Sequence, residues 1–280
     1  MRFASFVRDG LPGYGLVDDG MIRPVDNAFA ARFPDLKSAV AAGALDEAAA
    51  TASGDLDPAG VRFDPVIPNP GKIIGVGMNY LAHTAELRRE PPKAPSLFAR
   101  FADSIVGHEQ PIVRPSVSQQ FDYEGELAVI IGRAGRHIGA ADAFGHVAGY
   151  ACFLDGSVRD YQYRTSQFTA GKNFFRSGSF GPCLVTADAV DDPGSLRIET
   201  RVSGEVMQRG NTAQLCFGIA DLIEFLSAIF PLEPGDVIAT GTPSGVGAAR
   251  DPVRWLRPGD VVEVEIEGVG TLSNEVVDET

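Results

Sequence analysis

From Lys72 onward the chain is a succession of short apolar runs separated by glycine and proline, and this punctuation constrains the fold more than any other feature. Such runs of β-branched and aliphatic residues predict strands. The clearest are KIIGVG, LAVIIG, AGYACFLD, GPCLVT, LRIETRVSG, DVIAT and DVVEVEIEGVG. GIADLIEFLSAIF predicts a helix with one apolar face. Because strands and helices do not alternate regularly, the pattern favours an α+β, mainly β domain over a doubly wound sheet.

The first 70 residues predict a small N-terminal domain, which leaves residues 71–280 for a larger one. RFASFV alternates like a strand, and GYGLVDDGMIRPV predicts a hairpin that turns at Asp19-Gly20. The Ala-rich stretch over residues 34–52 predicts a helix in spite of Gly43. The proline-rich residues 53–71 predict a linker or a loop along an edge.

The charge and composition narrow the range of partners. The formal net charge of −13 argues against a nucleic-acid partner, which needs a basic surface, and against an anionic membrane. No apolar run approaches the roughly 18 residues of a membrane helix, and the N-terminus lacks the apolar core of a signal peptide. The three cysteines are widely spaced and odd in number, as suits reduced, buried thiols. We therefore expect a cytoplasmic protein whose partner is a small molecule.

Acidic residues stand at the entrance of the most apolar strand. In FDYEGELAVIIGR, Glu124 and Glu126 are two residues apart, so a strand would point both side chains to the same face. Asp155 ends another apolar strand, AGYACFLD. Three carboxylates that meet at two strand ends would form a hard-oxygen site for Mg²⁺ or Mn²⁺. The alternative is that both glutamates are solvated on an edge strand.

A histidine and a glutamate in NYLAHTAELRRE indicate acid–base chemistry. His83 and Glu86 are three residues apart, which makes them neighbours on one face of a helix. A carboxylate beside an imidazole fixes its tautomer and makes it a better base toward water. The segment lies between Gly77 and Pro91, as a mobile lid would. An ordinary surface pair on an amphipathic helix is the alternative.

Polar groups further along the chain could hold an anionic ligand. In DGSVRDYQ, Asp155, Arg159 and Gln162 have the spacing of one helical face, which would align a metal ligand, a cation and an amide. A salt-bridged helix start, with Asp155 as its N-cap, is the alternative. TGTPSGVG, over residues 240–247, is a turn whose threonine hydroxyls and backbone N–H groups could bind an oxyanion.

These motifs, in this order, resemble the fumarylacetoacetate hydrolase superfamily from Lys72 to the C-terminus. The segments that carry the resemblance are KIIGVGMNYLAHTAE, PSLFARFADSIVG, FDYEGELAVIIG, LDGSVRDYQ, Gly171-Lys172, GNTAQLCFGIADLIEFLS, LEPGDVIATGTPSGVG and GDVVEVEIEGVGTLSNEV. Within the superfamily the chain is similar to acylpyruvate hydrolases and to 2-hydroxyhepta-2,4-diene-1,7-dioate isomerases. The resemblance implies a sandwich-like roll of mixed β-sheets with a small N-terminal domain, and a homodimer that acts on 2-oxo acids and their enols.

The resemblance also implies a role for each motif residue. The residues that correspond to ligands of Mg²⁺ or Mn²⁺, which Ca²⁺ could replace in a crystal, are Glu124, Glu126 and Asp155. The catalytic residues would be His83 and Glu86, as a dyad that activates water, and Lys172, as a cation that stabilises developing negative charge. The residues that would bind the substrate are Tyr80, Arg159, Gln162 and Thr242.

Three positions depart from the pattern common in the superfamily. Leu154 replaces an asparagine beside the metal ligand, and Arg100 replaces a lysine after the PSLF segment. GKNFFRSGSFGP is aromatic and basic where many members are smaller and more acidic. Phe174-Phe175 could therefore face a bulky or aromatic substrate tail, or could pack in the core.

The first functional hypothesis is metal-dependent hydrolysis of a C–C bond in an acylpyruvate-like 2,4-diketo acid, which yields pyruvate and a carboxylic acid. The same site could instead decarboxylate an oxaloacetate-like acid, tautomerise a 2-hydroxy-dienoic acid or hydrate a 2-oxo-pentenoate. A protein that only binds a 2-oxo acid belongs to a different class. His83, Glu86 and Lys172 favour an enzyme, because binding alone does not require a dyad.

Overall fold

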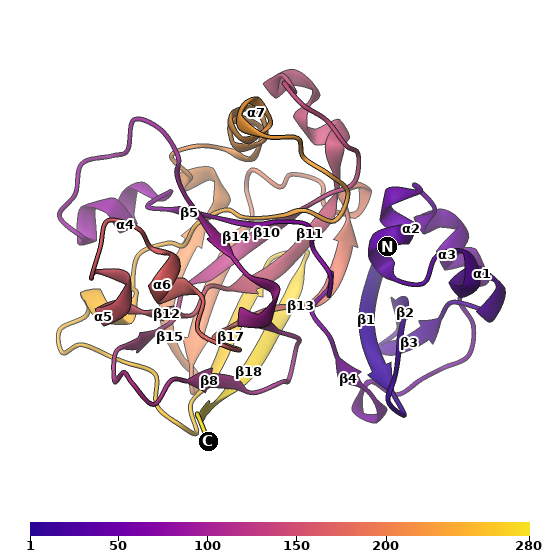
Figure 1. Cartoon of the computed structure of the whole chain (residues 1–280), viewed down its shortest axis with the longest axis horizontal. Helices are drawn as coiled ribbons and strands as arrows, with labels where there is room; N and C mark the ends of the chain where they lie inside the picture. The colour runs from indigo at the N-terminus through magenta and orange to yellow at the C-terminus, as the bar shows by residue number, and fades with distance from the viewer.

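Two β-sheets packed against each other form the body of the molecule in a computed structural model, which describes residues 1–280 (Figure 1). One is a mixed sheet of eleven strands, and the other has five strands. This arrangement confirms the α+β, mainly β fold and the mixed-sheet roll that the resemblance implies. None of the helices combines the length and the apolar character that crossing a membrane would require.

The strands of the eleven-stranded sheet come from all parts of the chain. In the order of hydrogen-bonded neighbours they are β3 (Met21–Pro24), β2 (Leu11–Asp18), β1 (Arg2–Arg8), β13 (Gly178–Thr186), β11 (Val147–Leu154), β10 (Gly125–Ile131), β16 (Val237–Ala239), β5 (Ile73–Gly77) and β6 (Ser96–Arg100). Two short strands lie off this path, β4 (Arg62–Phe63) beside β1 and β7 (Ile105–Val106) beside β13.

The five-stranded sheet and a two-stranded ladder complete the β-structure. The five strands, again in order, are β15 (Glu205–Asn211), β14 (Arg197–Val202), β17 (Val261–Ile266), β18 (Gly270–Asp278) and β8 (Ile112–Arg114). The ladder consists of β9 (Phe121–Asp122) and β12 (Ser157–Val158). The helices are α1 (Asn27–Arg32), α2 (Leu36–Ala41), α3 (Leu45–Thr51), α4 (Leu81–Glu86), α5 (Arg159–Gln162), α6 (Thr169–Lys172) and α7 (Ile219–Ile229).

Most of the predicted elements are present, and one is divided. Every apolar run named above as a strand forms one, and GIADLIEFLSAIF contains α7. The hairpin between β2 and β3 turns at Asp19 and Gly20, whose φ angles of 48° and 76° suit the two central residues of a type I′ turn. The single helix predicted over residues 34–52 is wrong, because Gly43 has a φ of 63° and separates α2 from α3.

Strand β10 is buried on both faces, which explains its uninterrupted apolar run. Leu127, Val129 and Ile131 point into a cluster of 34 buried residues that β10 shares with the five-stranded sheet and α7. Ala128 and Ile130 point the other way, into a second cluster of 20 buried residues. Alternate residues of a strand face opposite sides, so a central strand between two cores needs apolar residues at every position.

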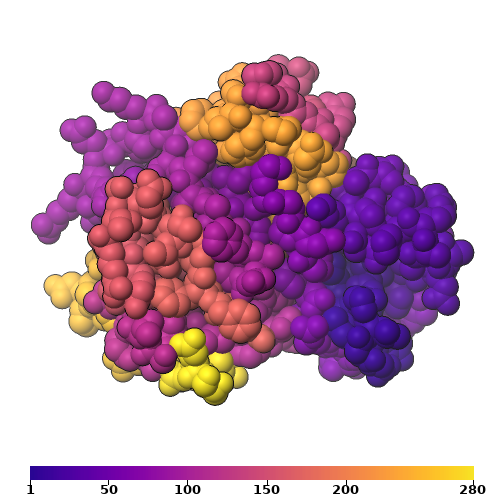
Figure 2. Space-filling model, in the orientation of Figure 1, coloured from indigo at the N-terminus to yellow at the C-terminus, as the bar shows by residue number.

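The second cluster joins the N-terminal segment to the body. Strand β1 pairs with β13, with Phe3 opposite Leu184, and the cluster contains Leu36 of α2 together with Phe153 of β11. The segment forms a lobe at one side of the molecule, shown in indigo in Figures 1 and 2. A boundary between domains at residue 70 stays a prediction, although one hydrophobic cluster contains residues from both sides of it.

We expect Phe3→Ala to lower the free energy of unfolding by about 3–5 kcal/mol, because it removes a fully buried aromatic ring from the core that joins β1 to the body. Urea denaturation of the whole chain measures this change. Leu11→Ala is the control: its side chain is 71% exposed, so the change should stay within about 0.5 kcal/mol. Equal stability of Phe3→Ala and wild type would mean that the lobe does not unfold with the body.

Candidate active site

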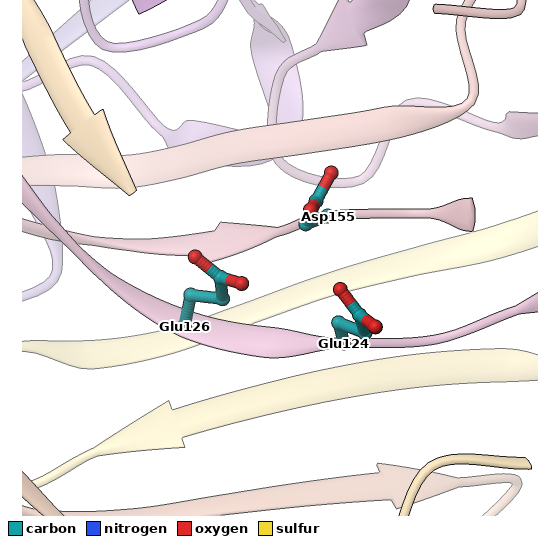
Figure 3. Close-up of side chains that lie close together, drawn as sticks. All are labelled: Glu124, Glu126 and Asp155. Carbon is teal, nitrogen blue, oxygen red and sulfur yellow. The ribbon is translucent and has the colours of Figure 1, made fainter. Parts of the chain in front are cut away.

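The pairing of β10 with β11 brings three carboxylates together. The two strands are antiparallel, with Gly125 opposite Leu154, and the backbone N–H of Asp155 donates to the Glu124 carbonyl over 2.8 Å. Glu124 and Asp155 therefore face each other across the ladder, and Glu126 follows on the same face. Ligand oxygens of the three buried side chains lie within 4.8 Å of one another, and Figure 3 shows their carboxyl groups side by side.

Gly125 allows this strand to run close to the second sheet. A Cβ atom at this position would lie 2.1 Å from the Thr200 hydroxyl and 3.2 Å from two methyl groups of Val264. Any larger residue would push β10 away from β14 and β17. The glycine between the two glutamates therefore sets how close β10 lies to the second sheet, and with it the position of both carboxylates.

Three buried cations surround this carboxylate cluster. The Lys172 Nζ lies 2.5 Å from an oxygen of Glu124 and 2.5 Å from an oxygen of Asp155. Arg100 donates to the other Asp155 oxygen over 2.5 Å, and one terminal nitrogen of Arg159 lies 2.6 Å from Glu124. Charged groups removed from water need such partners, since an unpaired buried charge is strongly destabilising.

The cations leave Glu124 and Glu126 in different electrostatic environments. Burial raises the pKa of Glu124, but Arg159 and Lys172 outweigh it and hold that pKa well below its usual range. Burial also raises the pKa of Glu126, and the neighbouring charges of Asp155 and Glu124 raise it further. Glu126 has no cation partner; the backbone N–H of Gly241 donates to it over 2.9 Å. Of these carboxylates, Glu126 is therefore the one whose ionised form an added positive charge would stabilise most.

Lys172 is held as a charged ammonium group in spite of its burial. Burial lowers the pKa of Lys172, but Asp155 and Glu124 raise it by more, so its pKa lies above the ordinary value. A lysine that stays cationic inside the protein can stabilise negative charge on a bound ligand. Phe98 lies against it, with the ring centre 5.0 Å from Nζ.

The chemistry of the donor set fits a hard divalent cation. Carboxylate oxygens are the preferred ligands of Mg²⁺ and Mn²⁺, and these three are buried and close together. The Tyr80 hydroxyl is also buried and has no hydrogen-bond partner. Burial raises its pKa, and the charge of Glu126 adds to this effect. A metal-ligating role for the three carboxylates stays a prediction, and a metal ion there would compete with Lys172 for the oxygens of Glu124 and Asp155 that the ammonium group contacts.

The predicted histidine–glutamate pair forms in α4. The His83 Nδ1 lies 2.6 Å from one Glu86 oxygen, and the backbone N–H of Gly245 donates to the other oxygen over 2.8 Å. Glu86 thereby fixes the imidazole orientation, and Nε2 is the ring atom left to exchange a proton. The helix is shorter than the predicted segment, since it ends at Glu86.

The predicted helical row of Asp155, Arg159 and Gln162 is wrong in its geometry. Asp155 directly follows β11, residues 157–158 form β12, and helix α5 begins only at Arg159. Pairing of β12 with β9 keeps these residues extended. Arg159 nevertheless reaches Glu124, and it donates to Gln162 over 2.8 Å.

The loop over residues 240–247 binds carboxylates of the protein itself. Besides the bonds of Gly241 to Glu126 and of Gly245 to Glu86, the Gly247 N–H donates to Asp122 over 2.7 Å. These N–H groups are thus engaged and do not point freely to a substrate oxyanion. The Thr242 hydroxyl donates to the Gly125 carbonyl and accepts from Gln208, while its side chain lines the pocket.

A small pocket of about 30 Å³ opens onto Glu124 and Glu126. Its polar lining consists of His83, Arg89, Glu124, Glu126, Arg159, Gln162, Lys172 and Thr242. Its apolar and aromatic lining includes Met78, Leu87, Phe98, Tyr163 and Phe168. Seven of the ten residues with predicted site roles line this pocket. Asp155 and Glu86 do not line it, but they contact Lys172 and His83, which do. The tenth residue, Tyr80, is buried near Glu126.

Sequence reasoning missed the aromatic wall and the carboxylate of Asp122. The aromatic residues of the pocket are Phe98, Tyr163 and Phe168. Phe174 instead packs edge-on against Tyr161 beside the core, which was the alternative for this pair, and Phe175 is exposed. Phe98 lies in the PSLF segment that carried part of the resemblance, but no local signal indicated which of its side chains points inward. Asp122 stands two residues before Glu124, and the sequence alone indicates no role for its carboxylate.

Comparison with known proteins defines the family. The model of the fumarylacetoacetate (FAA) hydrolase C-terminal family matches residues 72–277, so the chain belongs to this family. Human mitochondrial oxaloacetate tautomerase FAHD2A is 48% identical over 219 residues, which cover 78% of this chain and 70% of that protein.

Two solved structures resemble the chain over its whole length and theirs. Fumarylacetoacetate hydrolase from the psychrophilic Exiguobacterium antarcticum has a TM-score of 0.85 and 36% identity. Maleylpyruvate hydrolase from Sphingobium sp. SYK-6, solved in complex with manganese(II) ion and pyruvate, has a TM-score of 0.81 and 30% identity. The family therefore includes proteins named for hydrolysis and for tautomerisation.

We expect Glu126→Gln to weaken Mn²⁺ binding at least about tenfold, because it removes one anionic ligand and retains the size of the side chain. Titration followed by electron paramagnetic resonance measures free Mn²⁺ directly. Glu275→Gln, on an exposed position of β18, should bind Mn²⁺ like the wild type. Equal affinity of Glu126→Gln and Glu275→Gln would contradict the metal site.

Proposed function

We propose that the protein is an enzyme that interconverts the keto and enol forms of an oxaloacetate-like 2-oxo acid with the help of a divalent metal. The observation that carries the proposal is the convergence of three carboxylates, two buried cations and a paired histidine on one pocket. A 2-oxo acid and its enolate have negative charge at one end, and these groups can bind and stabilise it. The 48% identity with a protein named as an oxaloacetate tautomerase supports the choice of reaction.

Each residue of the pocket has a separate task in this proposal. The Arg159 guanidinium binds the substrate carboxylate, and the Lys172 ammonium faces the oxygen on C2 as it becomes negative. His83 takes a proton from C3 of the keto form through Nε2 and returns a proton to the C2 oxygen, so the imidazole ends in its starting state and the enol forms without a change in composition. A divalent cation held by Glu124, Glu126 and Asp155 would supply Lewis-acid stabilisation of the enolate.

Hydrolysis of a C–C bond in an acylpyruvate-like acid is the second candidate. The His83–Glu86 pair favours it, because a histidine fixed by a carboxylate can take a proton from water. The water would add to the distal carbonyl, and the C–C bond would break to give pyruvate enolate and a carboxylic acid. The similarity to maleylpyruvate hydrolase supports this reaction at 30% identity.

An absorbance assay separates these candidates. We expect the purified protein to accelerate the decay of the oxaloacetate enol band in Mg²⁺ or Mn²⁺ but not in EDTA, and to release no pyruvate from oxaloacetate. Pyruvate from an acylpyruvate, without enol conversion of oxaloacetate, would establish the hydrolase instead. Release of pyruvate from oxaloacetate would indicate a decarboxylase. If none of these reactions occurs but the protein still binds pyruvate, it is a 2-oxo-acid binder and not an enzyme of this class.

We expect His83→Ala to lower kcat at least about 100-fold, because either reaction needs the imidazole to transfer a proton. Steady-state kinetics at saturating metal measures the loss. His137→Asn is the control, since His137 is exposed and asparagine tolerates its φ of 53°. Equal kcat values for His83→Ala and His137→Asn would contradict the role of the dyad.

A further inference from the structure

One buried carboxylate next to the site belongs neither to the metal cluster nor to the dyad. Asp122 is fully buried, and its oxygens are not among those that cluster at Glu124, Glu126 and Asp155. Its carboxylate points toward the loop after Gly245 and toward Arg159. A charge in such a place needs an explanation, because desolvation of a carboxylate is unfavourable unless it is fully paired.

Four donors saturate the two oxygens of Asp122. The backbone N–H groups of Gly247 and Tyr123 donate to Oδ1 over 2.7 and 2.9 Å. The N–H of Ala248 donates to Oδ2 over 3.1 Å, and Nε of Arg159 donates to the same oxygen over 2.8 Å. Gly247 permits the close approach, because a Cβ atom there would lie 2.6 Å from Oδ1.

These contacts fix the plane and the direction of the Arg159 guanidinium. Asp122 holds Nε, and the Gln162 amide oxygen accepts from one terminal nitrogen over 2.8 Å. The other terminal nitrogen, Nη2, is buried and lies 2.6 Å from Glu124 without an aligned hydrogen bond. It belongs to a side chain that lines the pocket, so Nη2 is the donor left for a ligand.

We propose that Asp122 is a positioning residue, which holds the Arg159 guanidinium in the orientation that binds the substrate carboxylate. The inference rests on the proposed function, since it takes Arg159 as the group that binds the 2-oxo acid. Asp122 acts through Arg159 and is neither a group that we place against the substrate nor one of the predicted metal ligands. It also connects the substrate side of the pocket to the loop that holds Glu86 and Glu126.

Asp122→Asn is a sharp test because the two side chains have the same size and shape. An amide offers one oxygen in place of two and directs its NH₂ group at donors of the backbone or of Arg159. The charge-assisted bond to Arg159 is weakened or lost. We expect KM for oxaloacetate, and Kd for pyruvate with Mn²⁺ present, to rise about tenfold or more. We expect kcat to change less than about threefold, since His83 and Lys172 are not moved.

Asp260→Asn is the matched control for lost stability. Asp260 is another buried aspartate that accepts from an arginine and a backbone N–H: Arg254 donates to it over 2.6 Å and Arg257 N–H over 2.8 Å. It directly precedes β17 and does not line the pocket. We expect Asp260→Asn and Asp122→Asn to lower Tm by similar amounts. Asp260→Asn should leave KM and Kd unchanged.

A double-mutant cycle decides whether Asp122 acts through Arg159. If it does, adding Asp122→Asn to Arg159→Lys should raise Kd for pyruvate by less than about twofold. Multiplicative effects, or an unchanged Kd in Asp122→Asn, would overturn the proposal. Pyruvate binding by calorimetry does not depend on turnover, so wild type that binds pyruvate but converts no 2-oxo acid would refute the proposed reaction alone. Wild type that does not bind pyruvate with Mn²⁺ would remove the premise and overturn this inference as well.

Discussion

The structure depends on the way in which a group of buried carboxylates is paired with buried cations. Asp122, Glu124, Glu126 and Asp155 lie within or beside one pocket, and the buried cations that face them are Arg100, Arg159 and Lys172. Four carboxylates against three cations leave a formal charge of −1 when all are ionised. The uncompensated member is Glu126, which has only a backbone partner. A divalent cation at this place would relieve the repulsion that raises the pKa of Glu126.

A single loop supports three parts of the site. Backbone N–H groups between Gly241 and Ala248 donate to Glu126 of the metal cluster, to Glu86 of the dyad and to Asp122 behind Arg159. Backbone donors hold anions at fixed positions without side-chain entropy to lose. The residues that we propose as metal ligand, proton-transfer pair and substrate-binding cation are therefore placed relative to one common segment.

The sequence predicted the elements of the fold better than their arrangement. The strands and α7 follow from local patterns, and the burial of β10 on both faces follows from the absence of polar residues in LAVII. The register that sets Gly125 opposite Leu154 is a long-range property, which no local pattern contains. Gly43 illustrates a local failure, because a glycine at positive φ ended a helix that composition alone predicted to continue.

The sequence indicated which residues belong to the candidate site, and the structure shows which of their side chains contact one another. His83 and Glu86 are close because three residues of helix place them together, so spacing was sufficient. Arg159 reaches the cluster that contains Asp155 through its contact with Glu124, and not along one helical face, since an extended segment separates the aspartate from α5. Asp122 could not be distinguished from Glu124 by sequence, because its direction depends on a loop more than 100 residues away.

The most direct test of the account is anomalous diffraction from crystals grown with Mn²⁺ and pyruvate. We expect one strong anomalous peak among Glu124, Glu126 and Asp155, with the pyruvate carboxylate against Arg159. The absence of a peak at saturating Mn²⁺, with the Lys172 ammonium still bridging Glu124 and Asp155, would contradict it.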